Sequence, residues 1–397
     1  MKLSEIATLV EDKISSNSIS LGDYVTTDSL LPNKEGKNIA TNLPPVACSL
    51  THYQKGDVLV ANIRPYLKKV WLADKEGGCS SDVLVFRVRE GYKNSFLYAV
   101  LLQDRFFDYA TRGAKGSKMP RGDKEQIMRY ELPVFSPQEQ ENIGNIVISI
   151  TEKLRLNRAI NHNLEALTKQ LYDYWFVQFD FPDENGTPYK SSGGKMVWNE
   201  KLKREIPEGW KVKSIFEELS IQYGFPFSTE LFVEEQTSIP VVRIRDILSN
   251  SISAYTTEQI GERYRLQEKD LLIGMDGNFH MNYWSDNNSF LNQRSVRLRA
   301  VKSSVSIIQA RYDIEPHIKA KELRAKGSTV GHLSDKDLKD LFILVPSIKD
   351  LRITLDFILN NIIRNRIEIT KLTKLRDELL PLLMNSQVSV NYDLSHD

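Results

Sequence analysis

The chain is poor in cysteine. Its two cysteines, Cys48 and Cys79, lack the close spacing of a zinc site or a redox pair. Disulfide frameworks belong to oxidising compartments and use more cysteines than this. The sequence therefore favours a reducing compartment, and we expect a cytoplasmic protein.

Long hydrophobic runs are also missing. No apolar segment approaches the roughly 20 residues that cross a bilayer. The first ten residues form an amphipathic stretch that Glu5 interrupts, and they show no signal-peptide pattern. We therefore expect no contact with a membrane.

Net charge is nearly absent, because 53 Lys and Arg residues balance 52 Asp and Glu residues. A nucleic-acid surface would have to come from local segregation of charge, since the field of the whole protein cannot supply it. The 397 residues suggest two or three domains of ordinary globular composition.

Signatures of catalysis are missing as well. The sequence has no phosphate-binding loop, no dinucleotide-binding glycine motif, no His-Glu-x-x-His and no Gly-x-Ser-x-Gly. Its six histidines are scattered, so a metal cluster would have to be assembled entirely by the fold. We expect a non-catalytic chain with no metal or cofactor of its own.

The sequence contains two copies of one pattern of residues. Three dipeptides recur at offsets of 211, 213 and 208 residues: Gly116-Ser117 as Gly327-Ser328, Leu132-Pro133 as Val345-Pro346, and Asn157-Arg158 as Asn365-Arg366. The strand-like run after Gly56-Asp57 likewise recurs after Lys269-Asp270. Solenoid repeats have periods of only about 20 to 50 residues. The offsets therefore predict a tandem pair of whole domains.

Each copy ends in a long segment with heptad spacing. The first stripe comprises Ile150, Leu154, Asn157, Asn161, Leu164, Thr168, Leu171 and Trp175. The second, shifted by 208 residues, comprises Ile358, Ile362, Asn365, Ile369, Leu372, Arg376, Leu379 and Leu383. Alternating spacings of four and three are typical of a coiled-coil seam. An ordinary buried helix face is the alternative, but Asn157 and Asn365 favour the seam, because buried amides can fix its register.

The two helices are expected to pair with each other. Antiparallel pairing within one chain would relate the globular repeats by a pseudo-twofold axis. Pro137 follows Ser136 at a plausible first helical position, and Pro381 is expected to end or kink the second helix near its last turn. Helices of 30 to 40 residues would span about 45 to 60 Å and form a rigid spacer.

An aromatic run, from Tyr172 to Phe181, follows the first stripe. It is too aromatic to be exposed without a reason. We interpret Tyr174, Trp175 and Phe176 as a surface that either docks a partner or packs helices. The next stretch, 182–208, is rich in turn signals such as Asn185-Gly186 and is expected to be a linker.

Candidate DNA-binding side chains cluster in loops of both repeats. In the first repeat, cations stand among small residues that would allow a close approach to phosphates: Arg64, Lys68, Arg112, Lys115, Lys118 and Arg121. In the second, they are side chains that hydrogen-bond base edges or phosphates: Asn278, His280, Gln293, Arg294 and Lys326. A solvated loop is the alternative for the first set, and plain turn chemistry at Asp276-Gly277 is the alternative for the second.

These features together resemble the specificity subunits of Type I restriction-modification systems. The resemblance covers essentially the whole chain. The residues that carry it are the two Gly-Ser segments with their Leu132-Pro133-Val134 and Leu344-Val345-Pro346 continuations, Pro137-Gln138-Glu139-Gln140, the Leu171 to Val177 run, and Ile206-Pro207-Glu208-Gly209-Trp210.

The resemblance implies a DNA reader with two target-recognition domains, each reading one half of a bipartite sequence. The paired helices would set the spacing between half-sites and dock two modification (methyltransferase) subunits, which restriction subunits then join. S-adenosylmethionine, ATP and magnesium would belong to those partners. Two rivals remain: a non-catalytic scaffold whose tandem domains bind proteins, and a free-standing nuclease or methyltransferase.

The expected fold is α+β, with two similar mixed α/β domains and two long helices that form an antiparallel intramolecular coiled coil. The expected limits are 1–136 for the first recognition domain, 137–181 for the first helix, 182–208 for the linker, 209–345 for the second domain, 346–386 for the second helix and 387–397 for a tail.

Overall fold

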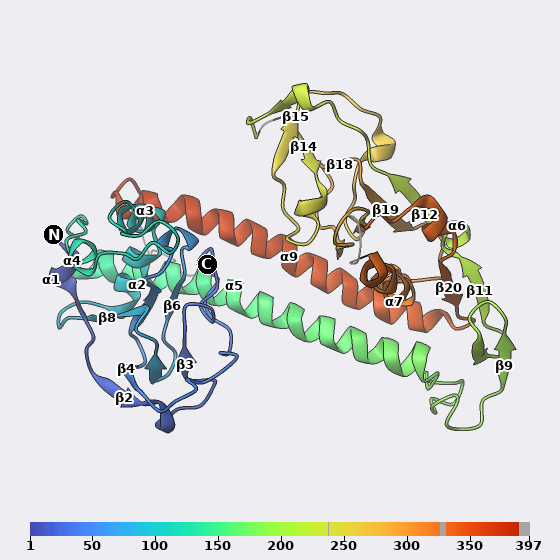
Figure 1. Ribbon diagram of the computed structural model, residues 1–397, viewed down its shortest axis with the longest axis horizontal. Coiled ribbons are helices and arrows are strands. Elements are labelled where there is room, and N and C mark those ends of the chain that lie inside the picture. Colours follow the sequence, from blue (N-terminus) through green and yellow to red (C-terminus); the bar gives the residue numbers. More distant parts are fainter. Residues whose placement is uncertain (237, 326–330, 389–397) are drawn as a thin grey trace, which may run out of the picture. The chain divides into compact units, whose positions relative to one another are not determined.

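The computed structural model describes residues 1–236, 238–325 and 331–388 (Figure 1). The chain divides into two compact units. Unit 1 comprises Met1–Leu156 with the segment that begins at Thr370, and unit 2 comprises Asn157–Ile369. Among the described helices, none is both long and apolar enough to cross a membrane.

Unit 1 is built on a four-stranded antiparallel sheet of order β1-β8-β5-β6. Its strands are β1 (Ala7–Leu9), β5 (Val58–Ala61), β6 (Val70–Leu72) and β8 (Val83–Val88). The unit's short helices are α1 (Leu3–Ile6), α2 (Asn94–Leu102), α3 (Asp104–Arg112) and α4 (Lys124–Met128). The central strand β5 is buried on both faces, because Val58 and Val60 pack with the helices while Leu59 packs toward a second sheet.

Unit 2 repeats this sheet in the order β12-β19-β16-β17. Its strands are β12 (Leu219–Tyr223), β16 (Leu271–Gly274), β17 (Met281–Tyr283) and β19 (Ser295–Ala300). The register is the same: Val58 lies opposite Phe86 in unit 1, and Leu271 lies opposite Leu298 in unit 2. The strand order and register of the main sheet therefore confirm the predicted tandem repeat.

The second sheet differs between the units. Its order is β2-β4-β7-β3 in unit 1 and β13-β15-β14-β18 in unit 2. The strands are β2 (Lys13–Ser15), β3 (Tyr24–Val25), β4 (Ser49–Tyr53), β7 (Gly77–Cys79), β13 (Phe232–Val233), β14 (Ile239–Val242), β15 (Ala254–Thr256) and β18 (Phe290–Leu291). Each sheet has one parallel pair, β3 with β7 and β14 with β18. The antiparallel neighbour of this parallel pair differs. In unit 1, β4 pairs with β7, the later strand of the parallel pair, whereas in unit 2, β15 pairs with β14, the earlier strand.

A buried carboxylate begins the central strand of each unit. Asp57 accepts two hydrogen bonds from Arg87, at 2.9 and 2.7 Å, and a third from the backbone of Gln54 at 2.8 Å. Asp270 likewise accepts two from Arg299, at 2.6 and 2.7 Å, and a third from the backbone of Gln267. Since both carboxylates are almost fully buried, these bonds replace the water that each loses on folding.

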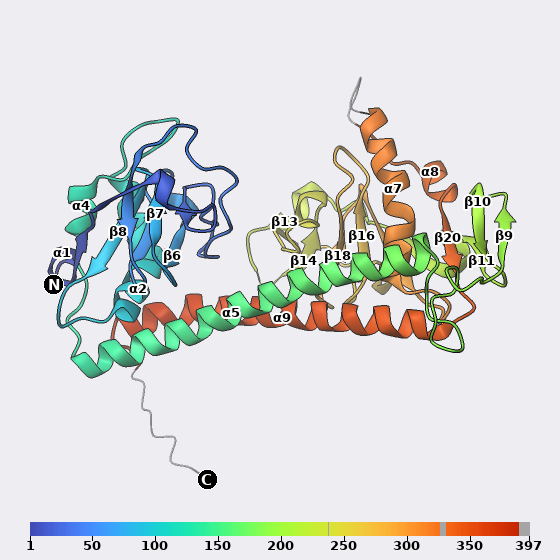
Figure 2. The ribbon, with the colours of Figure 1, turned by 90° about the horizontal axis from the view of Figure 1, so that it is seen from below.

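The long helices are α5 (Pro137–Tyr172) and α9 (Lys349–Met384). Within each unit, part of α5 lies beside part of α9 (Figures 1 and 2). Ser136 and Glu139 form a reciprocal cap at the start of α5. Pro381 lies within the last turn of α9, which continues to Met384. All sixteen predicted seam residues are buried or half-buried, as expected for a seam or for a buried helix face, and two of them, Leu171 and Trp175, pack with the core of unit 2.

Polar contacts across the seam show that the pairing in unit 2 is antiparallel. Asn157 donates to Glu368 at 2.8 Å, and Asn161, one turn later on α5, donates to the carbonyl of Ile362, earlier on α9. Asn365 donates to Asn161 at 3.0 Å. Asn157 and Asn365 therefore lie in the seam but are not partners of each other, because antiparallel pairing offsets equivalent positions of the repeat.

The aromatic run after α5 packs into the core of unit 2. A single π-helical turn, Asp173–Val177, continues α5, and Phe179 adopts a left-handed backbone (φ 65°) that ends it. Phe176, Phe179 and Phe181 all pack against Trp210. Tyr172 donates to Asp313 at 2.8 Å, and burial raises the pKa of that carboxyl to about 6.

The stretch expected to be a linker contains a hairpin. Its strands are β9 (Met196–Asn199) and β10 (Arg204–Pro207), and Met196, Val197 and Leu202 pack against the core of unit 2. The remaining elements are α6 (Ile215–Glu218), α7 (Ile307–Ala325), α8 (Asp335–Lys339) and the strand pair β11 (Lys211–Ser214) and β20 (Phe342–Val345).

The turn before each central strand generates a stability prediction. Gly56 has φ 93°, and its counterpart Lys269 has φ 72°. A side chain in this region costs about 1 kcal/mol, which glycine avoids. Lys269→Gly should therefore stabilise unit 2 by about 1 kcal/mol. Gly56→Ala should destabilise unit 1, because a Cβ there would lie 2.6 Å from Asn94 Nδ2.

Urea unfolding followed by tryptophan fluorescence would check this prediction, since four of the five tryptophans lie in unit 2. A Lys269→Gly transition at lower urea than wild type would contradict it.

Candidate nucleic-acid interface

The predicted contact residues concentrate at one edge of each main sheet, where the central strand ends. In unit 1, Ile63 forms a backbone bridge with Arg121, and Arg64 N donates to the carbonyl of Pro120 at 2.8 Å. In unit 2, Asp276 forms the matching bridge with His332. The two bridges are related by offsets of 213 and 211 residues, so the same edge is built twice. We call it the reading edge.

Four of the six residues predicted in unit 1 meet at this edge. Lys115 and Arg121 close a loop through two mutual backbone hydrogen bonds of 2.9 Å, and Lys118 lies exposed within it. Arg64 is exposed beside the loop. Lys115 pairs with Asp123 and Arg121 with Asp82, but the cationic side chains remain 83% and 60% exposed. Exposed pairs of this kind contribute little stability, so a phosphate could replace the carboxylates.

Lys68 lies in a different environment. Its ammonium group pairs with Asp104 at 2.8 Å, and Lys34 contacts both Asp104 and Asp377 of α9. Burial alone would raise the pKa of Asp104, but hydrogen bonds from Lys68 and Lys34 hold that pKa below its usual value. Lys68 thus belongs to a network that ties the globular part of unit 1 to α9.

Arg112 precedes the Lys115–Arg121 loop and lies in a different environment. It lies at the C-terminal end of α3 and lines a pocket with Lys2, Arg105 and Arg129.

In unit 2, Asn278, Gln293 and Arg294 are exposed, and His280 is half-buried. Arg294 lies 3.4 Å from Asp276, whose other oxygen lies 2.6 Å from Nδ1 of His332. The backbone of His280 closes the turn, because its carbonyl accepts from Gly274 N. Lys326, Gly327 and Ser328 lie outside the described residues.

Sequence reasoning did not identify Asp276, Asp82 or His332 as residues of this edge. In the sequence, His332 is only one of six scattered histidines. The repeat offset could have found it, because His332 lies 211 residues after Arg121. Tyr66 and Met119, 50% and 53% exposed, were also missed. Tyr66 follows Arg64 by two residues and Met119 lies within the Lys115–Arg121 loop, and apolar contacts can read a thymine methyl group.

Arg64 and Arg294 adopt left-handed backbone conformations, with φ 53° and 66°. Such conformations cost free energy for residues that carry a Cβ, and they cluster at functional sites. Glycine would remove this cost at both positions. Arginine at both positions therefore supports a role for the side chain rather than for the turn.

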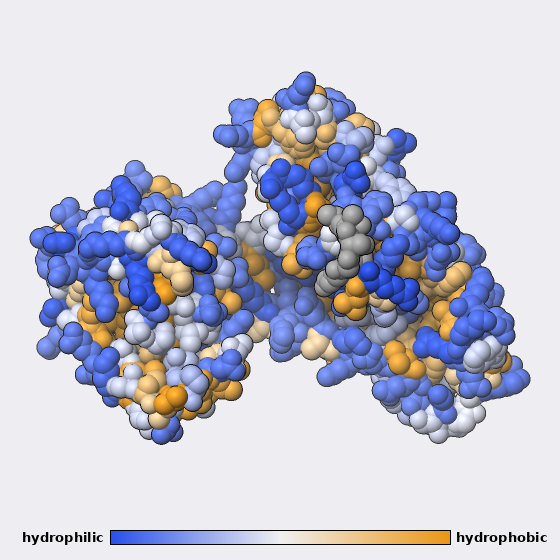
Figure 3. Space-filling model, in the orientation of Figure 1, coloured by the Kyte–Doolittle hydropathy of each residue, from blue (hydrophilic) through white to orange (hydrophobic). Residues whose placement is uncertain are grey.

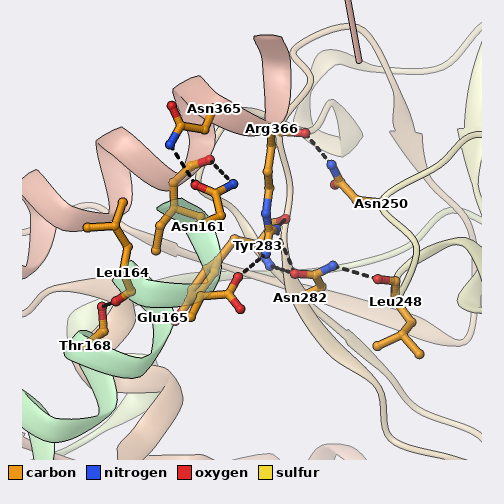
Figure 4. Close-up of polar contacts among 12 residues, drawn as sticks. Asn161, Leu164, Glu165, Thr168, Leu248, Asn250, Asn282, Tyr283, Asn365 and Arg366 are labelled. Carbon is orange, nitrogen blue, oxygen red and sulfur yellow. Dashed lines mark hydrogen bonds and ion pairs between the residues drawn. The ribbon is translucent and has the colours of Figure 1, made fainter. Parts of the chain in front are cut away.

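A polar network attaches α9 to the segment that leaves the reading edge of unit 2 (Figure 4). Arg366 donates to the side chain of Asn282 at 2.9 Å and to the carbonyl of Tyr283 at 3.0 Å, and it also contacts Glu165 of α5. Asn282 in turn donates to the carbonyl of Leu248. The Asn-Arg dipeptide that recurs in the sequence thus serves here to position β17.

The three residues predicted to dock a partner lie in different environments. Trp175 and Phe176 are buried in the core of unit 2, so a partner cannot contact them without disrupting that core. The packing alternative describes these two side chains. Tyr174 is 38% exposed, and docking remains a prediction for it alone.

No metal site emerges in the described part of the chain, where no group of three or more His, Cys, Asp or Glu side chains could hold an ion.

Comparison with known proteins identifies the family. The family model described as the Type I restriction modification DNA specificity domain matches residues 1–166 and 207–379. The chain belongs to this family. The two matched segments cover both copies of the repeat, which agrees with the tandem architecture of the specificity chain.

Individual relatives point the same way. The chain is 23% identical over 362 residues to the Type I restriction enzyme MjaIX specificity subunit of Methanocaldococcus jannaschii, covering 86% of this chain and 80% of the relative. It is 28% identical over 148 residues to the EcoBI specificity subunit of Escherichia coli, covering 37% and 31%. A crystal structure of the S subunit from M. genitalium matches with a TM-score of 0.58 and 16% identity, covering 97% and 95%, and it shows the same fold.

The strained arginines of this specificity chain give a second prediction. Arg294→Gly should stabilise unit 2 by about 1 kcal/mol and weaken DNA binding, because relief of backbone strain comes with loss of the side chain. If the Arg294 side chain makes a bidentate hydrogen bond to a base, its loss should reduce the free-energy difference between binding of the correct and of a wrong base by about 1 to 3 kcal/mol. Lys269→Gly, at the opposite end of β16, is the matched control and should stabilise without affecting DNA binding.

Urea unfolding and fluorescence anisotropy with a target duplex would measure the two effects separately. DNA affinity that is unchanged in Arg294→Gly would remove Arg294 from the interface.

Proposed function

We propose that this chain is the non-catalytic, DNA-reading subunit of a Type I restriction-modification complex, and that each unit reads one half of a bipartite target. The observation that carries the proposal is the doubled reading edge. In both units, exposed cationic or amide side chains stand where the central strand ends. Such groups bind phosphates and base edges.

The two half-sites are expected to differ in sequence. The reading edge of unit 1 presents Arg64, Lys118 and Arg121, whereas that of unit 2 presents Asn278, Gln293 and Arg294. Arginine favours guanine, and asparagine and glutamine favour adenine. The second sheets also differ in strand order. These differences support an asymmetric target.

We further propose that the paired helices set the number of base pairs between the half-sites. This role is typical of the family that the sequence resembles. It is supported by the unbroken 36-residue length of α5, about 54 Å at 1.5 Å per residue, and by polar seam contacts that oppose sliding of one helix along the other.

Methylome sequencing would test the reading function. The chain and a modification subunit would be expressed in a host that lacks DNA methylation, with the modification subunit alone as control. A bipartite methylated motif should appear only when the chain is present. Replacing residues 209–345 by those of a relative should then change one half-site and leave the other intact.

A soluble complex that methylates no motif would favour the rival scaffold, whose domains bind proteins instead of DNA. Methylation or cleavage by the purified chain alone would favour the rival enzyme.

Docking of two modification subunits, which restriction subunits then join, is the proposed assembly. The outer surface of α5 and of the π-helical turn that continues it supports this assembly. Ile160, Leu167 and Tyr174 are 46%, 43% and 38% exposed there and are spaced by seven residues. Leu375 and Leu382 of α9 occupy the positions equivalent to Leu167 and Tyr174 and are also exposed. An apolar heptad stripe outside the seam is suited to binding another helix.

S-adenosylmethionine, ATP and magnesium are proposed to bind the partner subunits rather than this chain. The sequence motifs for such ligands are missing from it.

The double variant Ile160→Glu and Leu167→Glu tests the docking surface. It should abolish co-purification with the modification subunit, because two charges would be buried in an apolar contact. The matched control is Ala159→Glu with Ala166→Glu, which adds the same charge to exposed neighbours on α5. Size-exclusion chromatography with mass measurement reads the outcome, and a wild-type complex mass for the first variant would exclude this stripe as the docking site.

A further inference from the structure

A pocket of about 390 Å³ in unit 1 concentrates positive charge outside the reading edge. It is lined by Lys2, Arg105, Tyr109, Arg112, Arg129 and the Tyr130–Glu131 pair. Four of these side chains are cationic and one is acidic. The chain as a whole carries a formal charge of only +1, so the pocket is a local segregation of charge.

Three elements build the pocket. Arg105, Tyr109 and Arg112 project from one face of α3, since they are spaced by four and three residues. Arg129 follows the C-terminal end of α4. Lys2 is placed by a backbone bridge with Glu131. The arginines are thus positioned by helices, and Lys2 is positioned by a backbone bridge to a residue far away in the sequence.

The arginine side chains of the pocket differ from the neighbouring loop cations in their partners. Among the described residues, none of the side chains of Arg105, Arg112 and Arg129 forms an ion pair or a hydrogen bond, although the two cations at the closed ends of the neighbouring loop, Lys115 and Arg121, are both paired. Four cations share the pocket with a single carboxylate, Glu131, so Coulomb repulsion among them is not balanced by the protein. An anionic ligand would remove that repulsion.

We propose that this pocket binds a phosphate of the DNA backbone next to the half-site read by unit 1, as a contact that does not depend on sequence. The inference rests on the proposed function. Arginine suits this ligand, because its planar fork binds phosphate oxygens through two hydrogen bonds.

The position of the pocket favours DNA over a protein partner. Arg112 and Lys115 are three residues apart, so their Cα atoms are separated by at most about 11 Å. Phosphates follow one another along a strand with a rise of about 3.4 Å. A duplex that contacts the Lys115–Arg121 loop therefore has phosphates within reach of the pocket.

The surface around the pocket also argues against a protein partner. Protein interfaces usually have an apolar core, but none of the pocket residues is an exposed large hydrophobic residue. On the face shown in Figure 3, the surface over α3 and α4 is mostly hydrophilic. The pocket at the equivalent place of unit 2, which includes Lys319 and Asp340, has mixed charges, so the proposed contact belongs to unit 1 alone.

The test compares the double variant Arg105→Gln and Arg112→Gln with the control double variant Lys55→Gln and Lys93→Gln. Both remove two charges from unit 1. The control lysines are exposed and lie outside the pocket, and Lys55 precedes β5 at the end opposite the reading edge. Each chain is purified in complex with a modification subunit. Anisotropy is measured on a cognate duplex and on one with scrambled half-sites, over a range of salt concentrations, and thermal unfolding checks that both variants fold.

The pocket variant should bind both duplexes more weakly by a similar factor. The slope of log affinity against log salt should become shallower by about 0.9 for each phosphate that the protein no longer neutralises. The methylated motif should stay the same, and the control should resemble wild type.

Other outcomes would overturn the proposal. A pocket variant that binds DNA like the control would remove the pocket from the interface, while the reading function would stand. If the pocket variant co-purified with less modification subunit, but the complex that still formed bound DNA as tightly as wild type, the pocket would be assigned to an acidic protein surface. A changed methylated motif would make the contact sequence-specific. Absence of DNA binding by the wild-type complex would reject the proposed function itself, and the pocket proposal with it.

Discussion

The register of the central strand in each unit depends on one buried carboxylate, Asp57 or Asp270. Each satisfies an arginine from the neighbouring strand and the backbone of the turn before it. Removing one partner of a buried pair would leave an uncompensated charge, at a cost of about 3 to 5 kcal/mol. Because side chains alternate along a strand, a slip by one residue would turn every core residue to the opposite face. The pair therefore fixes where the strand ends, and so where the reading edge lies.

This arrangement separates the part of each unit that must stay constant from the part that can vary. The main sheet keeps its order and register in both copies, while the second sheet differs in strand order and the reading edges differ in side chains. Exposed loop residues contribute little to the core, so they can change without loss of the fold. New surface contacts can therefore arise on this scaffold without a new core.

The sequence predicted what depends on periodicity and failed where contacts join distant residues. Heptad spacing identified both seams, and constant offsets identified the repeat, since each signal is contained in the order of residues. By contrast, Lys68 looked like the other loop cations but shares Asp104, 36 positions away, with the buried Lys34. The composition of the aromatic run predicted only that it must pack against something. Its partner Trp210 follows a β-hairpin that the sequence analysis had interpreted as a linker because of its turn signals. No local pattern could reveal such partners.

Polar residues between α5 and α9 fix how the two helices align. A seam made only of leucine and isoleucine would be more stable but would tolerate sliding by a heptad. Asn161 accepts from Asn365 and donates to the carbonyl of Ile362. A shift of one heptad would remove these partners from the buried Asn161 and the half-buried Asn365. Arg366, one residue after Asn365, holds the strand that leaves the reading edge of unit 2. The same turn of α9 therefore contacts both α5 and β17, so the alignment of the two helices and the position of the strand that leaves the reading edge depend on each other in unit 2.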